Sequence, residues 1–102
     1  MSRKVTRTSA AINDLISHAT YLGEKSPGLD ERFLDAVEQG FALLAQMPEL
    51  GGAYEVLDPR LQGIRVWSVK EFESYLVFYF ARAAEVQIVR VLHGARDITA
   101  IL

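Results

Sequence analysis

Apolar and polar positions alternate in three short runs toward the end of the chain. Residues 63–69, 75–81 and 86–92 carry β-branched and aromatic side chains at the two-residue period of a strand. Short polar segments around Glu71 and Arg82 join these runs. The run 75–81 is apolar on both faces, as expected of a central strand. The pattern predicts an antiparallel meander of three strands.

Upstream of the meander, the apolar positions follow a helical period over residues 9–47. Thr8 or Ser9 is expected to cap the first helix by accepting a backbone N–H bond. One continuous stripe then runs along this helix at i, i+3, i+4, i+7 and i+10: Ile12, Leu15, Ile16, Ala19 and Leu22. We expect this stripe to face the core.

A second helix is predicted after a break at residues 23–28. Ser26 is the expected N-cap and Pro27 the first helical residue. The predicted inner stripe consists of Phe33, Val37, Phe41 and Leu44. Pro48 and the following glycines end the helix. Residues 9–47 therefore predict a helical hairpin.

The second helix has more apolar surface than a simple hairpin needs. Leu34 and Leu43 widen its apolar stripe, and between residues 40 and 47 only Gln46 is polar. A helix that is apolar nearly all round is usually buried on several sides. Either the sheet and the first helix cover it, or a partner chain covers part of it.

The order of elements predicts a single α+β domain over residues 1–102. A weak strand at residues 3–8 precedes the two helices and the meander, and residues 48–62 are expected to be a loop. The order β-α-α-β-β-β implies a twisted, mostly antiparallel sheet with the helical hairpin on one face. The other face is expected to carry Arg65 or Trp67 and Tyr75 or Tyr79.

Composition narrows the possible chemistry and partners. The 102 residues include no cysteine, which excludes disulfides and thiolate catalysis. No signal peptide or apolar run of about 20 residues is present, so we expect a cytoplasmic protein that does not enter a membrane. The net charge is −2. Since nucleic-acid binders are usually basic, direct sequence-specific binding of nucleic acid is not expected.

Few residues have side chains that suggest catalysis or the binding of a metal or cofactor. His93, Arg96 and Asp97 follow the last strand and suit either acid–base work or the anchoring of a terminus; we favour anchoring. His18 is expected on the solvated surface of the first helix. With only two histidines and no ligand spacing, no metal site is expected, and no glycine pattern for a phosphate or dinucleotide cofactor occurs.

Basic and aromatic residues interleave in the second half of the chain. The basic members are Arg60, Arg65, Lys70, Arg82, Arg90 and Arg96. With Trp67, Tyr75 and Tyr79 they could form a face that stacks and pairs with RNA. The alternative, which we favour, is a sheet whose exposed positions carry arginine for solubility, because nearby glutamates dilute the patch.

Taken together, several short motifs resemble a known family. The second helix contains R-F-L-D-A-V (residues 32–37) and is followed by M-P-E-L-G (47–51). The strands contain G-I-R-V-W and Y-L-V-F-Y, and the tail reads V-L-H-G-A-R-D-I. In this order and spacing, the motifs resemble the RelE/ParE superfamily of bacterial toxins from type II toxin–antitoxin systems, and its ParE branch in particular.

The resemblance implies a function and two alternatives. A ParE-like chain would poison DNA gyrase. A RelE-like chain would cut mRNA on the ribosome, with His93, Arg65 and Arg90 as the catalytic candidates. The net negative charge and the lack of a tyrosine after His93 favour the ParE interpretation. The second alternative is a non-toxic module that only binds its antitoxin.

The resemblance also implies a cognate antitoxin. Its C-terminal segment would be disordered alone and would fold onto the toxin. We expect Leu34, Leu43 and Met47 to form part of the antitoxin-binding surface. Arg96 and Asp97 match family positions and would either contact the target or stabilise the tail.

Overall fold

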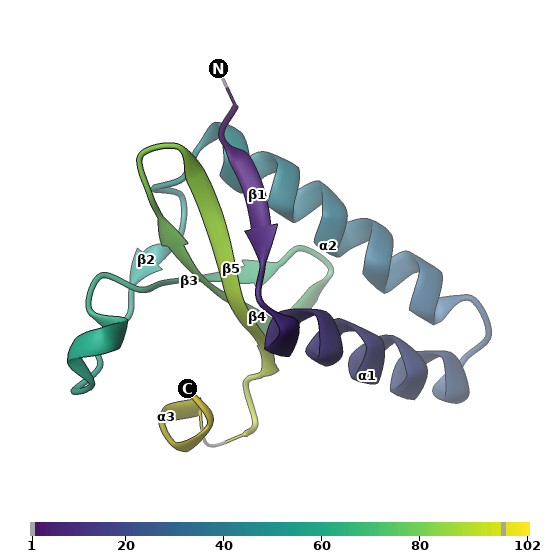
Figure 1. The fold of residues 1–102 in the computed structure, drawn as a ribbon. Coiled ribbons are helices and arrows are strands. Elements are labelled where there is room, and N and C mark those ends of the chain that lie inside the picture. Colours follow the sequence, from purple (N-terminus) through teal and green to yellow (C-terminus); the bar gives the residue numbers. More distant parts are fainter. Residues whose placement is uncertain (1, 97) are drawn as a thin grey trace.

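Two long helices pack against one face of a five-stranded sheet (Figure 1). The computed structural model describes residues 2–96 and 98–102, and these counts refer to that part of the chain. The elements are β1 (Lys4–Arg7), α1 (Ser9–Lys25), α2 (Leu29–Gln46), β2 (Gly52–Ala53), the 3-10 turn η1 (Pro59–Leu61), β3 (Arg65–Val69), β4 (Phe72–Ala81), β5 (Glu85–His93) and α3 (Ile98–Ile101). The strand order is β1-β5-β4-β3-β2. Only β1 runs parallel to its neighbour, so the predicted α+β class and mostly antiparallel sheet are confirmed.

The predicted meander corresponds to β3, β4 and β5, with β4 starting earlier than expected, at Phe72. The prediction that residues 48–62 form a loop is wrong in part. Gly52 and Ala53 pair with β3, and η1 follows Asp58, whose side chain accepts a bond from the backbone N–H of Arg60 at 2.9 Å. A two-residue strand is too short to show a period, which is why the sequence pattern missed it.

The start of α1 confirms one predicted cap, because the Thr8 hydroxyl accepts the Ala11 N–H at 3.0 Å. The predicted limits of the turn between the helices are wrong. α1 continues past Gly23 to Lys25, and α2 begins only at Leu29. The N-cap of α2 is Gly28, with a φ of 86° that disfavours side chains. The chain therefore reverses direction over residues 26–28, and Pro27 lies in this turn.

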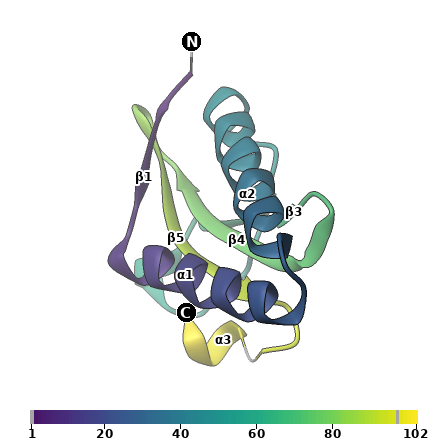
Figure 2. The same cartoon turned by 90° about the vertical axis from the view of Figure 1, so that its right-hand side faces the viewer.

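The main core lies between the helices and the sheet, and Figure 2 shows α1 and α2 together in front of the strands. The predicted inner stripe of α2 is confirmed, since Phe33, Val37, Phe41 and Leu44 are all buried. The stripe of α1 is wrong in part: Leu15 and Leu22 are buried, whereas Ile12 and Ile16 are 45% and 61% exposed. Within residues 2–96 and 98–102, no helix is both long enough and apolar enough to cross a membrane.

A smaller core covers the opposite face of the sheet. Ile64, Phe78, Leu92 and Ile98 are buried there beneath residues of the 54–61 segment and of α3. The expectation that Trp67 and Tyr75 or Tyr79 would occupy this face is wrong, because all three pack in the main core. Both alternating sets of β4 are apolar, so periodicity could not tell which set faces the helices. With these rings under the helices, the basic and aromatic face for RNA, which the sequence analysis did not favour, is not formed.

Candidate functional site

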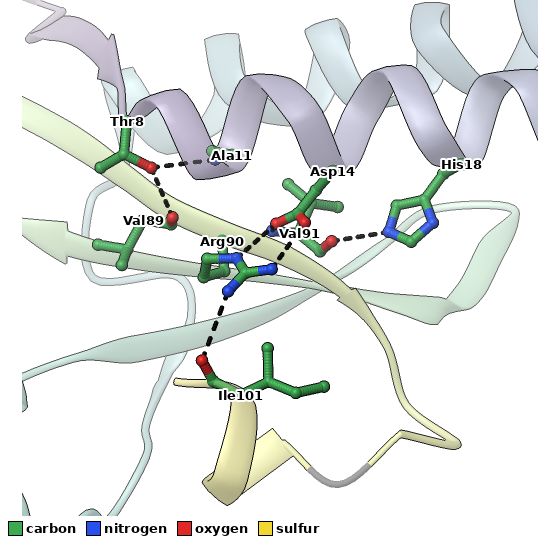
Figure 3. Close-up of polar contacts among 8 residues, drawn as sticks. All are labelled: Thr8, Ala11, Asp14, His18, Val89, Arg90, Val91 and Ile101. Atoms are coloured by element: carbon green, nitrogen blue, oxygen red, sulfur yellow. Dashed lines mark hydrogen bonds and ion pairs between the residues drawn. The ribbon is translucent and has the colours of Figure 1, made fainter.

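Helix α1 lies along the part of β5 that β1 does not reach (Figure 3). Polar side chains of α1 and of its N-cap, Thr8, bond to the β5 backbone there, where no neighbouring strand pairs with it. The Thr8 hydroxyl donates to the Val89 carbonyl at 2.7 Å, and Asp14 Oδ2 accepts the Val91 N–H at 3.0 Å. His18 Nε2 lies 2.7 Å from the Val91 carbonyl. Since a carbonyl only accepts, Nε2 carries the proton. These contacts satisfy the backbone edge of β5 at residues 89 and 91.

The position of His18 corrects the prediction of a solvated surface histidine. Its imidazole is half-buried, and its ring centroid lies 4.9 Å from that of Tyr75 in an edge contact. His18 follows Asp14 by four residues, so both side chains point from the same face of α1 toward β5. The spacing was visible in the sequence, but the strand edge that both side chains meet was not.

Arg90 connects three elements. Its guanidinium forms a bidentate ion pair with Asp14, with Nε–Oδ2 at 2.7 Å and Nη2–Oδ1 at 2.8 Å. Nη1 also donates to the Ile101 carbonyl of α3 at 3.4 Å (Figure 3). The hydrogen bond from Asp14 raises the pKa of Arg90 above its ordinary value. The positive charge of Arg90, a catalytic candidate only under the nuclease alternative, is therefore paired within the fold.

Arg65 is also engaged by the fold. Its guanidinium donates to the Gly51 carbonyl and, at 3.4 Å, to the Glu49 carbonyl. The buried Tyr79 hydroxyl holds the same loop, donating to the Pro48 carbonyl at 2.7 Å and accepting the Gly51 N–H at 2.9 Å. Burial raises the pKa of Tyr79. Arg65 and Tyr79 together fix the connection between α2 and β2.

The predicted tail residues lie at the end of β5. His93 Nδ1 accepts the Ala95 N–H at 3.1 Å, and its ring meets Tyr75 edge-on with centroids 5.0 Å apart. Arg96 is exposed, and its backbone N–H donates to the His93 carbonyl at 3.0 Å. Asp97 lies outside the described residues. His93 thus orders the turn that follows the strand.

The three residues predicted for the nuclease alternative do not converge. Arg65 pairs with Tyr79 across the sheet, and His93 pairs with Tyr75. These partners are four positions apart on β4, which separates Arg65 from His93 by about 13 Å along the strand. Arg90 lies on the opposite face of the sheet, beside α3. No single phosphate group can contact all three side chains in this arrangement.

A hollow on this surface lies between α1 and α2. We call it the interhelical groove; it measures about 760 Å³. Its apolar lining comes mainly from Ile12, Leu15, Ile16, Ala19 and Leu34, with Glu24, Asp30, Arg7 and Glu38 around them. Ile12 and Ile16 are thus exposed on the lining of this groove.

Leu34, Leu43 and Met47, the predicted antitoxin contacts, lie on different parts of the surface. Leu34 lines the interhelical groove. Leu43, 38% exposed, borders a hollow beside Trp67, whereas Met47, 50% exposed, borders another beside Arg3. Nine residues make two and a half helical turns, so Leu34 and Leu43 face opposite sides of α2. A single straight groove cannot contain all three.

Comparisons with known proteins agree with this architecture. Residues 5–98 match the family model described as "ParE toxin of type II toxin-antitoxin system, parDE". A solved structure titled "Chromosomal ParDE TA system from P. aeruginosa" is similar, with a TM-score of 0.72 and 16% sequence identity. The match covers 90% of this chain and 96% of that chain, and at this identity it concerns the fold alone. No curated protein matches the sequence.

Proposed function

Because the chain belongs to the ParE toxin family of type II toxin–antitoxin systems, we propose that it arrests bacterial growth by inhibiting DNA gyrase. The observation that carries this proposal is the family match over residues 5–98. Membership of the family implies a ParD antitoxin as partner. We propose that this antitoxin neutralises the toxin in the cytoplasm.

The geometry favours inhibition by binding over RNA cleavage. Catalysis of phosphoryl transfer needs donors and a base gathered around one reacting group. Arg65, Arg90 and His93 lie apart, and the guanidiniums of both arginines contact groups of the fold. The chain carries a net charge of −2, which opposes the approach of ribosomal RNA. Arg96 and Asp97 are proposed to contact the target or to anchor the tail.

We propose that the antitoxin wraps around α2. Leu34 faces the interhelical groove, and Leu43 faces away from it. An antitoxin segment that contacts Leu34, Leu43 and Met47 must therefore pass over more than one side of the helix. Segments that fold on binding suit such a path, because they can cover a large surface without a preformed shape.

Replacing Leu43 with glutamate is expected to weaken antitoxin binding by about tenfold or more, because a charge would enter an apolar contact. The side chain is 38% exposed, so the fold should survive. Leu57→Glu is the matched control, since Leu57 is 97% exposed and lies outside α2. Calorimetric titration of each variant with the antitoxin measures the effect. Unchanged affinity of a folded Leu43→Glu variant would remove this residue from the interface.

Expression of the chain alone in bacteria tests the proposed toxicity. We expect growth arrest that co-expression of the antitoxin relieves. Normal growth, with folded protein that binds the antitoxin, would instead support a non-toxic antitoxin-binding module. Codon-positioned cuts in mRNA on purified translating ribosomes would support the RelE-like nuclease. These three outcomes distinguish the proposed function from both alternatives.

A further inference from the structure

A separate hollow opens at the end of the sheet where β5 stops and β4 starts. Tyr21 and Lys25 line it from the last turns of α1. Tyr75 lines it from β4, and His93 from the end of β5. We call it the sheet-end pocket; it measures about 440 Å³, which lies within the usual range of small-molecule sites. None of its described lining residues borders the interhelical groove.

The Tyr75 side chain is buried, but its hydroxyl lacks a partner. Tyr75 is only 7% exposed. The rings of His18, Phe33 and His93 surround it, with centroids 4.9, 4.9 and 5.0 Å away. In the described part of the chain its hydroxyl forms no hydrogen bond, yet it is not sealed in the core, where Thr6 Oγ1 alone is fully buried and unpartnered. Burial raises the pKa of Tyr75, so the phenol keeps its proton at neutral pH. Since buried polar side chains normally have a partner, the hydroxyl is free to donate to a group in the pocket.

Two further donors of the sheet-end pocket lack an acceptor. His93 Nδ1 accepts the Ala95 N–H, so Nε2 carries the proton of the neutral ring, and no described residue accepts it. Lys25 forms no ion pair within the described residues; its Nζ lies over the Tyr21 ring, 5.2 Å from the centroid. Three side chains that line one pocket thus have hydrogen-bond donors to spare. A ligand that satisfies them must carry several acceptor atoms.

The other lining groups define the charge and shape of this ligand. Glu71 and Glu73 also border the pocket, and Glu73 Oε2 accepts the Glu71 N–H at 2.8 Å. With His93 neutral, two carboxylates and the ammonium of Lys25 give the lining a net charge of −1. This charge opposes an anion, and the carboxylates can accept N–H groups. Tyr21, 52% exposed, offers a ring for stacking. A nucleobase combines a flat neutral ring with acceptors and N–H donors on its edge.

We infer that the sheet-end pocket binds a nucleobase, presented by a free nucleoside. The Tyr75 hydroxyl and His93 Nε2–H donate to ring nitrogens or carbonyl oxygens of the base, and Glu73 accepts an N–H from it. The base stacks on Tyr21, as bases do on exposed aromatic rings in other proteins. The net charge of the chain, −2, opposes a long strand of phosphates, which favours a free nucleoside over a nucleic acid.

Titration of the full chain with guanosine, adenosine, cytidine and uridine tests the inference, with NMR of the histidine and tyrosine rings as the readout. We expect at least one nucleoside to bind with a Kd of about 1 mM or lower. It should shift the ring signals of His93 and Tyr75, but not those of Tyr54, which packs on the opposite face of the sheet. Ribose and inorganic phosphate should not bind. Failure of all four nucleosides to bind, or equal binding of phosphate, would overturn the inference.

The variant Tyr75→Phe removes the unpaired hydroxyl and keeps the ring. We expect it to weaken nucleoside binding at least about fivefold, because a hydrogen bond to the base is lost. Its melting temperature should not fall, since the hydroxyl bonds no described residue. Tyr54→Phe is the matched control, because the Tyr54 ring meets Phe78 in the smaller core, away from the pocket. Nucleoside binding that survives Tyr75→Phe unchanged would place the site elsewhere and overturn the inference.

Single-stranded DNA separates the two sources of a base. We expect a strand of about ten nucleotides to bind no more tightly than the best nucleoside, because its phosphates meet a chain of net negative charge. Tighter binding of the strand, lost in Tyr75→Phe, would overturn the assignment to a free nucleoside. Antitoxin affinity and growth arrest are measured with no added nucleoside. This inference and the proposed function can therefore fail separately.

Discussion

Replacing Gly51 with alanine is expected to lower the free energy of unfolding by about 2–4 kcal/mol. A Cβ at this position would lie 2.6 Å from the Tyr79 hydroxyl oxygen and 2.7 Å from the Val66 carbonyl oxygen. One of these atoms must move, and the hydroxyl cannot leave without breaking its bonds to the loop. The buried Tyr79 hydroxyl then loses its partners on the Gly51 and Pro48 backbone. Urea unfolding followed by circular dichroism measures the change.

The adjacent glycine supplies the control. A Cβ at Gly52 would meet nothing within 4 Å, so Gly52→Ala should change the free energy of unfolding by less than about 0.5 kcal/mol. Combining Gly51→Ala with Tyr79→Phe should cost less than the sum of the single changes, because both disrupt the same bonds. Equal stability losses for Gly51→Ala and Gly52→Ala would contradict the proposed role of the Tyr79 hydroxyl.

Replacing Asp14 with alanine is expected to cost about 2–4 kcal/mol. The change removes both hydrogen bonds to the partly buried Arg90 guanidinium and the bond from the Val91 N–H. It leaves a charge and a backbone donor without their partner at the contact between α1 and β5. Thermal and urea unfolding measure the loss.

A second bidentate ion pair provides the comparison for Asp14. Glu38 pairs with Arg7 at 2.6 Å, but these side chains are 53% and 32% exposed, against 12% and 25% for Asp14 and Arg90. Water screens the more exposed pair, so Glu38→Ala should cost less than about 1 kcal/mol. Asp14→Asn should fall between the two, because its amide oxygen can still accept the Val91 N–H. Similar losses for Asp14→Ala and Glu38→Ala would refute the special role of Asp14.

The sequence predicts elements well where one face differs from the other. The inner stripe of α2 is a clear example, because Phe33, Val37, Phe41 and Leu44 recur at the helical period and are all buried. The apolar stripe of α1 extends beyond the part of the helix that the core buries. Periodicity places Ile12 and Ile16 on the apolar side of α1, but only the packing of α2 decides that they line a groove.

Contacts between distant residues account for most of what the sequence did not predict. Asp14 and Arg90 are 76 positions apart, and nothing local in either segment points to the other. The sequence did contain one indication that the nuclease candidates lie apart. Arg90 and His93 differ by an odd number of positions on one strand, which places them on opposite faces. The tail motif therefore argued against a shared catalytic site for these two residues.

Supercoiling of relaxed plasmid DNA by purified gyrase, with and without the chain, tests the proposed function most directly. We expect supercoiling to fall, cleaved DNA to accumulate in complex with gyrase, and purified antitoxin to reverse both effects. Full gyrase activity in the presence of excess folded chain would contradict inhibition of gyrase.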